Sequence, residues 1–345
     1  MYTIQASGRN ATDLQGPAPA TMLRRMRLST IALLLLTIGT GERLLNPGPV
    51  TAITHAASPT PAPLAPLDSL RAALEARIAA LRAQVPTAVV AVAVRDLGPG
   101  GGALDVAGDS VFHAASTMKL PVMIELYRSA DRGALALDQE ILLVNQFASA
   151  ADGSPYALDA GDDSDSAAYA LVGRRVPVRE LVRRMIVRSS NLATNAVITL
   201  ADPVRTTATA RALGASRIEV RRGVEDNVAF RAGIINTTTA PDLAALLVAL
   251  ERGRAASPAS TRAMLDILAA QEHNGEIPAG LPPGTRVAHK TGSITGVLHD
   301  AAIVYPAGRP PYVLVVLTRG VPDEQVARRA IVDLARLTHA ALAAR

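Results

Sequence analysis

The strongest constraint on the fold is the order in which strand-like and helical segments follow one another along the chain. A β-branched run at 87–97 ends at the glycine-rich residues 98–102, as expected for a buried strand and a turn. Helical spacing of apolar residues then prevails to about residue 270. Near the other end of the chain, strand-like segments follow in hairpin succession at 284–293, 299–306 and 311–320.

We therefore predict an α/β plus all-α fold, in which one antiparallel sheet is built from both chain ends and flanked by helices. A helical subdomain is inserted at about 114–240. Amphipathic segments at 67–85 and 323–344 are the expected flanking helices. The hydrophobic fraction of 49% is ample for the core of one domain, which we place at 68–345.

The first 57 residues are typical of a secretory signal peptide or an N-terminal anchor. Arg24, Arg25 and Arg27 precede the apolar run 28–39, which is too short to span a bilayer comfortably but suits an export signal. Residues 58–67 are predicted to form an extended proline-rich linker. We expect an exported protein, periplasmic or extracellular, with its N-terminus as a candidate membrane tether.

Composition excludes several classes of function. Five arginines against Asp13 and Glu42 give residues 1–56 a net charge of +3, so the rest of the chain contributes only +2 to the total of +5. With 3% aromatic residues it lacks the basic stripe and stacking residues of a nucleic-acid-binding protein. There is no cysteine and the six histidines are dispersed, so we predict no metal or organic cofactor. A monomer is the default expectation.

Only two of the 35 basic residues are lysines, Lys119 and Lys290. Arginine is permanently charged, whereas a buried lysine can give up its proton. Ser116 and Lys119 are three residues apart at a predicted helix start, which places hydroxyl and amine on one face. A neutral amine can activate a serine hydroxyl, and a helix N-terminus can stabilise an oxyanion. The pair is typical of a serine nucleophile with a lysine base.

This spacing alone is a weak signal, but further motifs follow it. SSN (189–191) supplies a hydroxyl and a carboxamide, and KTGS (290–293) lies on a predicted strand. Together with STMK (116–119) and NTTTAPDLA (236–244), these motifs make the chain similar to class A serine β-lactamases. The resemblance covers roughly residues 68–345, within the wider superfamily of penicillin-binding proteins and β-lactamases.

The resemblance implies an acylation machinery of four residues. Ser116 would be the acylated nucleophile, and Lys119 would be its base or proton relay. Ser189 would pass a proton to the leaving nitrogen. Asn191 would hold the substrate's side-chain amide and orient Lys119.

The third motif would bind the substrate. The resemblance implies that Lys290 and Thr291 recognise the substrate carboxylate, because a cation and a hydroxyl suit that group. Gly292 and the small residues after it would let a ligand backbone lie alongside the strand. The backbone N–H groups of Ser116 and Ser293 would form the oxyanion hole.

Deacylation is the step at which this sequence departs from the family pattern. Class A enzymes use a Glu to activate the hydrolytic water and an Asn four residues later to help hold it. Glu225 matches the Glu, but Ala229 stands where the Asn would be, and Asn227 is a candidate substitute. Ser190 replaces the usual Asp, a second departure.

An alternative for Glu225 is structural pairing with Arg221 or Arg222. The polar loop 148–168 also has two interpretations. Asp162, Asp163 and Asp165 could suggest calcium, but we favour a solvated acidic loop. Tyr156, in the same loop, is a candidate wall of the cleft.

The predicted function is hydrolysis of penicillin-type β-lactams through an acyl-serine intermediate. The first alternative is a D-alanyl-D-alanine carboxypeptidase or a related peptidoglycan amidohydrolase, which would act on a stem peptide with the same residues. The second is an inactive binding module of the envelope, against which the three intact motifs argue.

Overall fold

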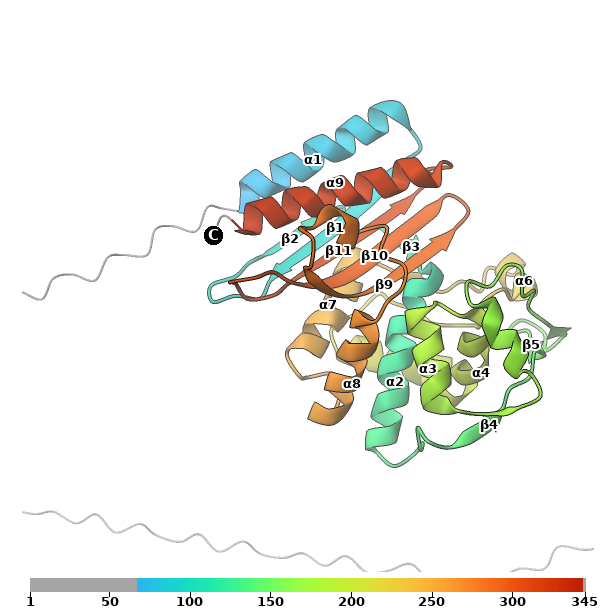
Figure 1. Cartoon of the computed structure of the whole chain (residues 1–345). Helices are drawn as coiled ribbons and strands as arrows, with labels where there is room; N and C mark the ends of the chain where they lie inside the picture. The colour runs from blue at the N-terminus through green and yellow to red at the C-terminus, as the bar shows by residue number, and fades with distance from the viewer. Residues whose placement is uncertain (1–66, 344–345) are drawn as a thin grey trace, which may run out of the picture. The chain divides into compact units, whose positions relative to one another are not determined.

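The computed structural model describes residues 67–343 (Figure 1). The predicted leader at 1–57 lies outside the described residues, as does the predicted linker except for its last residue. That residue, Leu67, is the first residue of a helix rather than the end of the linker.

The sheet is assembled from both chain ends, as predicted. Its five strands are antiparallel and lie in the order β2-β1-β11-β10-β9. Val92 of β1 pairs with Val316 of β11, so the N-terminal and C-terminal segments meet in the middle of the sheet. The strand that carries the third motif, β9, is an edge strand. The bounds are β1 (Val89–Asp96), β2 (Ala103–Val106), β9 (Arg286–Ile294), β10 (Val297–Tyr305) and β11 (Tyr312–Arg319).

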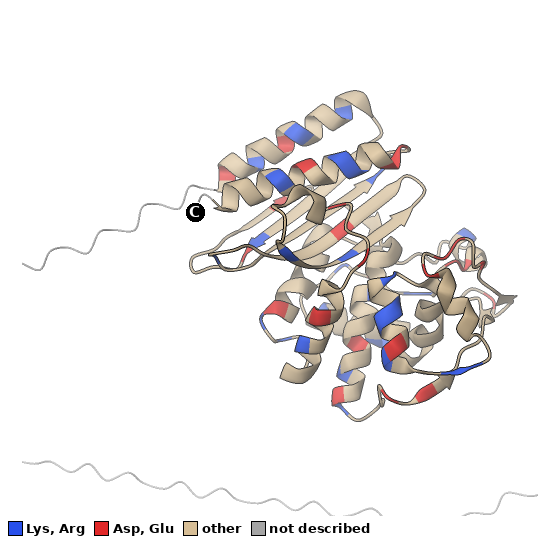
Figure 2. Ribbon diagram, in the orientation of Figure 1, with Lys and Arg blue, Asp and Glu red and all other residues tan. Residues whose placement is uncertain are grey.

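Alternation along the central strands gives the sheet two buried faces. On β1, Val92 and Val94 belong to one apolar cluster and Ala91 and Ala93 to the other. The first face is covered by α1 (Leu67–Gln84) and α9 (Glu324–Ala343), which lie side by side in Figure 1. Figure 2 shows charges of both signs along these two helices, while the strands between are mostly uncharged.

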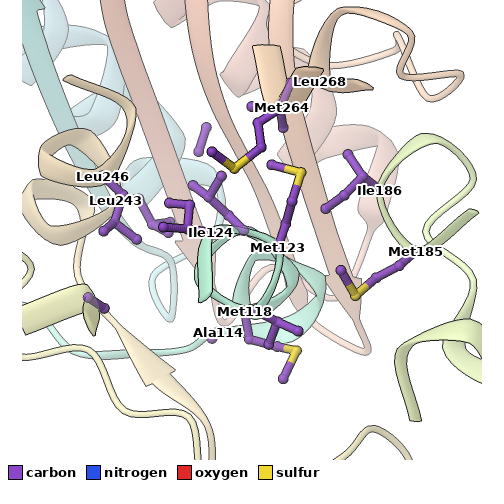
Figure 3. Close-up of a cluster of buried hydrophobic side chains, with 14 of the residues drawn as sticks. Ala114, Met118, Met123, Ile124, Met185, Ile186, Leu243, Leu246, Met264 and Leu268 are labelled. Carbon is purple, nitrogen blue, oxygen red and sulfur yellow. The ribbon is translucent and has the colours of Figure 1, made fainter. Parts of the chain in front are cut away.

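The second face of the sheet meets the helical part of the molecule. Against it pack α7 (Ala240–Glu251) and α8 (Pro258–Ala269). Next to them lies α2 (Lys119–Asp131), whose side chains are buried almost all round, as expected for a central helix. Figure 3 shows Met123 and Ile124 of α2 among side chains from several helices.

The remaining helices complete this part of the fold. They are α3 (Val178–Val187), α4 (Asn191–Ala201), α5 (Pro203–Ala212), α6 (Asn227–Arg231), and the 3₁₀ turns η1 (Ala115–Met118), η2 (Ser166–Leu171) and η3 (Pro278–Gly280). Short strands pair as β3 (Phe112–His113) with β8 (Thr237–Thr238), β4 (Glu140–Leu142) with β7 (Arg175–Pro177), and β5 (Phe147–Ala148) with β6 (Pro155–Tyr156). Within residues 67–343 no helix is both long and apolar enough to span a bilayer.

Replacing Leu74 by alanine tests the packing of α1 on the sheet. Leu74 is fully buried against the first face, so Leu74→Ala should lower the free energy of unfolding by about 2–5 kcal/mol. Leu142→Ala is the matched control, because Leu142 is 55% exposed, and it should change stability by less than about 0.5 kcal/mol. Urea unfolding followed by circular dichroism measures both. Equal effects would mean that α1 does not pack as described.

Candidate active site

A cleft of about 450 Å³ lies where the end of β9 meets the helical part of the molecule. Four of the predicted site residues line it: Ser116, Asn191, Glu225 and Ser293. A larger cavity of about 690 Å³ lies among the turns at the other end of β9, and none of the motif residues line it. We therefore place the chemistry in the smaller cleft.

Ser116 lies in η1, one turn before α2, rather than in the first turn of an α-helix as predicted. The turn is held locally: the backbone N–H of Ala115 donates to His113 Nδ1 at 3.0 Å. Ala115 has a φ of 44°, a conformation that non-glycine residues rarely adopt. This bend presents Ser116 to the cleft, while Lys119 begins α2 beneath it.

Glycine at 292 allows β9 to approach this turn. A Cβ atom added there would lie 3.0 Å from the backbone nitrogens of both Ser116 and Thr117, a distance that only a shift of the backbone could relieve. The close approach brings together the two segments that were predicted to supply the oxyanion donors, Ser116 and Ser293.

The two lysines, one from each part of the fold, meet at the hydroxyl of Ser189. Lys119 Nζ donates to Ser189 Oγ at 3.2 Å, to Ser189 O at 2.5 Å and to Asn191 Oδ1 at 2.8 Å. Lys290 Nζ donates to Ser189 Oγ at 2.9 Å and to Thr291 O at 2.9 Å. Both lysines are fully buried. In the described part of the chain no hydrogen bond joins Lys119 Nζ to Ser116 Oγ, a contact that substrate binding can tighten.

Burial makes both amines easier to deprotonate. It lowers the pKa of Lys119 well below its ordinary value, and the nearby charge of Lys290 lowers it further. The carboxylates of Asp163 and Glu225 act in the opposite direction on Lys119. Burial likewise lowers the pKa of Lys290 to about 7, although Asp300 raises it. For Lys290, the neutral and the charged amine are therefore both accessible near neutral pH.

Asn191 connects Lys119 to Glu225. Its Oδ1 accepts the bond from Lys119, and its Nδ2 donates to Glu225 Oε1 at 2.5 Å. Burial raises the pKa of Glu225, whereas the bond from Asn191 lowers it. Glu225 lines the cleft, and its side-chain partner among the described residues is Asn191 rather than Arg221 or Arg222. The expected pairing of Glu225 with an arginine is therefore not what holds its carboxylate.

Backbone strain gathers at the same place. Among the described residues, five that are not glycine have positive φ, and three of them are Ala115, Ser189 and Glu225. Such conformations cost free energy and tend to cluster at active sites. They mark the same cleft independently of the motifs.

A model of the beta-lactamase enzyme family matches residues 73–342. The chain belongs to the beta-lactamase enzyme family. It is 29% identical over 214 residues to a β-lactamase of Streptomyces albus G, covering 61% of this chain and 66% of that protein. The chain thus spans about two thirds or less of the length of the curated relatives it matches.

Solved structures of the family share its fold. An ancestral class A β-lactamase is 29% identical, with a TM-score of 0.67 over 78% of this chain and 99% of that one. A variant of PBP-A in an acyl-enzyme complex with penicillin G is 25% identical, with a TM-score of 0.68 over 82% and 99%. The resemblance to class A enzymes and the predicted fold are confirmed.

Two asparagines with no predicted role, Asn195 and Asn236, hold the loop that carries Glu225. Asn195 Oδ1 accepts from Val224 N at 2.8 Å, and its Nδ2 donates to Val224 O at 3.0 Å. Asn236 Oδ1 accepts from the backbone N–H groups of Arg221 and Arg222, and its Nδ2 donates to Arg222 O. A polar residue inside the apolar helical run LATNAVITL was the available signal for Asn195.

The departures from the family pattern have distinct structural outcomes. Ala229 is buried, and its backbone N–H donates to Asp226 in the cap of α6. Asn227 lines the cleft, which keeps it a candidate for holding a water. Ser190 caps α4 by accepting from Ala193 N at 3.2 Å.

The predicted solvated acidic loop is wrong for two of its three carboxylates. Asp163 and Asp165 are buried, because Asp163 accepts backbone hydrogen bonds from the start of α4 and Asp165 pairs with Arg184 of α3. Tyr156, predicted as a cleft wall, instead lies behind the Glu225 loop, where its hydroxyl accepts from Asn195 Nδ2.

Because the chain has only two lysines, their ionisation can be followed directly. With ¹³Cε-labelled lysine, NMR should show two signals whose midpoints both lie below the ordinary value of 10.5, with Lys290 at about 7. The Lys290→Arg variant assigns the remaining signal to Lys119. Two midpoints near 10.5 would show that the amines are solvated, contrary to the buried arrangement.

Proposed function

We propose that this chain opens the ring of penicillin-type β-lactams through an acyl-enzyme at Ser116. The observation that carries the proposal is the convergence of two buried amines on Ser189 Oγ, beside a cleft lined by Ser116 and Glu225. Membership of the family and the acyl-enzyme of the PBP-A variant support it.

Acylation uses the lowered pKa of Lys119. In its neutral form Lys119 takes the proton of Ser116 Oγ, which attacks the lactam carbonyl carbon. The backbone N–H groups of Ser116 and Ser293 stabilise the oxyanion. Ser189, bonded to both amines, then donates a proton to the leaving nitrogen and is reprotonated by a lysine. The C–N bond of the ring breaks, and the acyl group stays on Ser116.

Deacylation uses Glu225. Its carboxylate, held by Asn191 and facing the cleft, accepts a proton from a water that attacks the acyl carbon. Hydrolysis breaks the bond to Ser116 Oγ and regenerates the hydroxyl. The raised pKa that burial gives Glu225 makes it a better base than a solvated carboxylate.

Substrate binding is assigned to the end of β9. The carboxylate of the substrate is attracted by the Lys290 ammonium, and its amide lies along the edge strand. Thr291 is buried, and its carbonyl accepts from Lys290 Nζ, so the exposed wall of the cleft on this strand begins at Ser293.

The proposal places the enzyme outside the cytoplasm as a monomer, periplasmic or extracellular. Residues 1–57 support this location because their sequence has the pattern of an export signal. The alternative within this proposal is that the same residues stay attached and anchor the protein to a membrane. The described part of the chain carries the catalytic domain.

A second candidate is a penicillin-binding peptidase that acts on D-alanyl-D-alanine stem peptides. One observation favours it: the buried Ala229 offers no side chain to help Glu225 hold a water. The similarity to PBP-A fits either activity. The two candidates differ in how long the acyl group stays on Ser116.

Mass spectrometry of the intact protein after mixing with benzylpenicillin separates the candidates. Wild type should show a short-lived adduct while the drug is consumed, and Ser116→Ala should show none. Glu225→Gln should accumulate the adduct, because loss of the base slows deacylation by about 10²–10⁴-fold. Asn227→Ala tests whether Asn227 helps to hold the water.

The alternative functions predict different mass spectra over time. A long-lived adduct on wild type, unchanged by Glu225→Gln, identifies a peptidase in which Glu225 is not the base. A wild type that never forms an adduct contradicts both candidates and revives the inactive binding module.

The pH dependence of kcat/KM tests the carboxylate contact. Lys290 is an ammonium below a pKa of about 7 and neutral above it, so kcat/KM for benzylpenicillin should fall as the pH rises through 7 to 8. Lys290→Arg should lose this alkaline limb, because arginine stays charged. The methyl ester of benzylpenicillin, which has no carboxylate, is the control and should show no such limb with wild type.

A further inference from the structure

We propose that Asp163 is a positioning residue for the catalytic pair Lys119 and Glu225, which it aligns by anchoring the start of α4. It lies outside the three motifs. The inference rests on the function proposed above.

Asp163 holds the first residues of α4 with both of its carboxylate oxygens. It is 6% exposed. The backbone N–H of Asn191 donates to Oδ1 and Oδ2 at 3.0 Å each, and that of Leu192 donates to Oδ2 at 2.8 Å. Ser190 Oγ accepts only from Ala193 N, one residue further along. The backbone N–H groups of the first turn of a helix have no partners inside the helix. In α4 one of them donates to the N-cap residue Ser190, and two donate to Asp163 from another loop.

The anchored residue is the one that joins the catalytic groups. The side chain of Asn191 contacts Lys119 and Glu225, and its backbone is the part that Asp163 fixes. A shift of the first turn of α4 would therefore move both side-chain atoms of Asn191 at once: Oδ1, which accepts from Lys119, and Nδ2, which donates to Glu225. Misplacement by about 1 Å far from the reacting bond can cost a factor of about 10² in rate.

The loop that carries Asp163 is itself fixed to the junction between α3 and α4. Ser164 Oγ donates to Arg188 O at 2.8 Å and to Ser189 O at 3.3 Å. Asp165 pairs with Arg184 and Arg188 of that junction, and its backbone N–H donates to Asp163 Oδ1 at 2.9 Å. Asp163 is therefore held in place before it holds α4.

Charge supports the geometry. A carboxylate is favoured at a helix N-terminus, where the backbone dipoles leave a partial positive charge. The negative charge of Asp163 also raises the pKa of Lys119 and that of Glu225. A single carboxylate next to Asn191 therefore influences the pKa of both Lys119 and Glu225.

The first arm of the test compares two buried carboxylates that both accept backbone N–H groups. Asp163→Asn removes the negative charge at the start of α4 and should slow both acylation and deacylation, measured by stopped flow and mass spectrometry, by roughly 30–100-fold. Asp242→Asn is the matched control, because Asp242 is also buried but accepts from the backbone N–H of Arg217 rather than from α4. It should lower the melting temperature but leave both rates within about threefold. Equal kinetic effects of the two variants would overturn the proposal.

The second arm moves the carboxylate. The double variant Asp163→Asn, Ser190→Asp returns a carboxylate to the first turn of α4 and should recover most of the lost rate. Ser190→Asp alone would place its carboxylate beside that of Asp163, and it should therefore be no faster than wild type. The double variant also retains a cap if Asp163→Asn alone folds poorly. A double variant as slow as Asp163→Asn, although folded, would count against anchoring.

The third arm does not depend on activity. With ¹³Cε-labelled lysine, Asp163→Asn should move the Lys119 signal and lower its titration midpoint, since a nearby negative charge is lost while Lys290 and Glu225 remain. The amides of Asn191 and Leu192 should exchange faster with deuterium. Asp242→Asn should leave the Lys119 signal in place, because Asp242 is not among the charges that act on Lys119. A wild type that never acylates would refute the proposed function, and this arm would still decide whether Asp163 anchors α4 as inferred.

Discussion

The hydroxyl of Ser189 lies between two buried amines, and much of the structure serves that arrangement. An unpaired ammonium in a protein interior is costly, so each must find acceptors and opposite charge. Lys119 finds three oxygen acceptors on Ser189 and Asn191, and Lys290 finds Ser189 Oγ and a carbonyl of its own strand. One lysine starts a helix and the other lies on the edge strand, so their meeting defines how the two parts of the fold must pack.

Carboxylates set around this pair limit how far burial lowers the pKa of each amine. Asp163 and Glu225 act on Lys119, whereas Asp300 and Glu276 act on Lys290. Asp300 is fixed in turn by His289, with a hydrogen bond to Nδ1 at 2.9 Å. The loop carrying Glu225 is held by the neutral amides of Asn195 and Asn236. It is also held by the carboxylate of Asp226, which accepts hydrogen bonds from Ser149 Oγ and Ala150 N.

Periodicity and motifs were sufficient to predict four of the five strands of the sheet and several of the residues around Ser189, but the edge strand β2 was not predicted. The strands are β-branched and continuous because both faces are buried, which separates them clearly from the helical block. The motif residues were recognisable since their spacing reflects chemistry. Asp163 and Asp165 were not, because a run of acids and glycines has the composition of a solvated loop. Their partners, the first amides of α4 and the arginines of α3, lie elsewhere in the sequence and only the fold brings them close. The partner of Glu225 was missed for the same reason. The sequence suggested an ion pair with the nearby Arg221 or Arg222, whereas the actual partner, Asn191, lies 34 residues away.

The pairing of β1 with β11 also determines when the proposed active site can form. Val92 and Val316, partners in the middle of the sheet, are 224 positions apart, so a loop of that length must close before they meet. Contacts so distant in sequence slow folding far more than they reduce stability. Lys290 lies on β9, which reaches β1 only through β10 and β11. A chain that is still being made can therefore contain Ser116 and its helix while the site lacks Lys290, and the proposed active site is complete only once the last strands have been added.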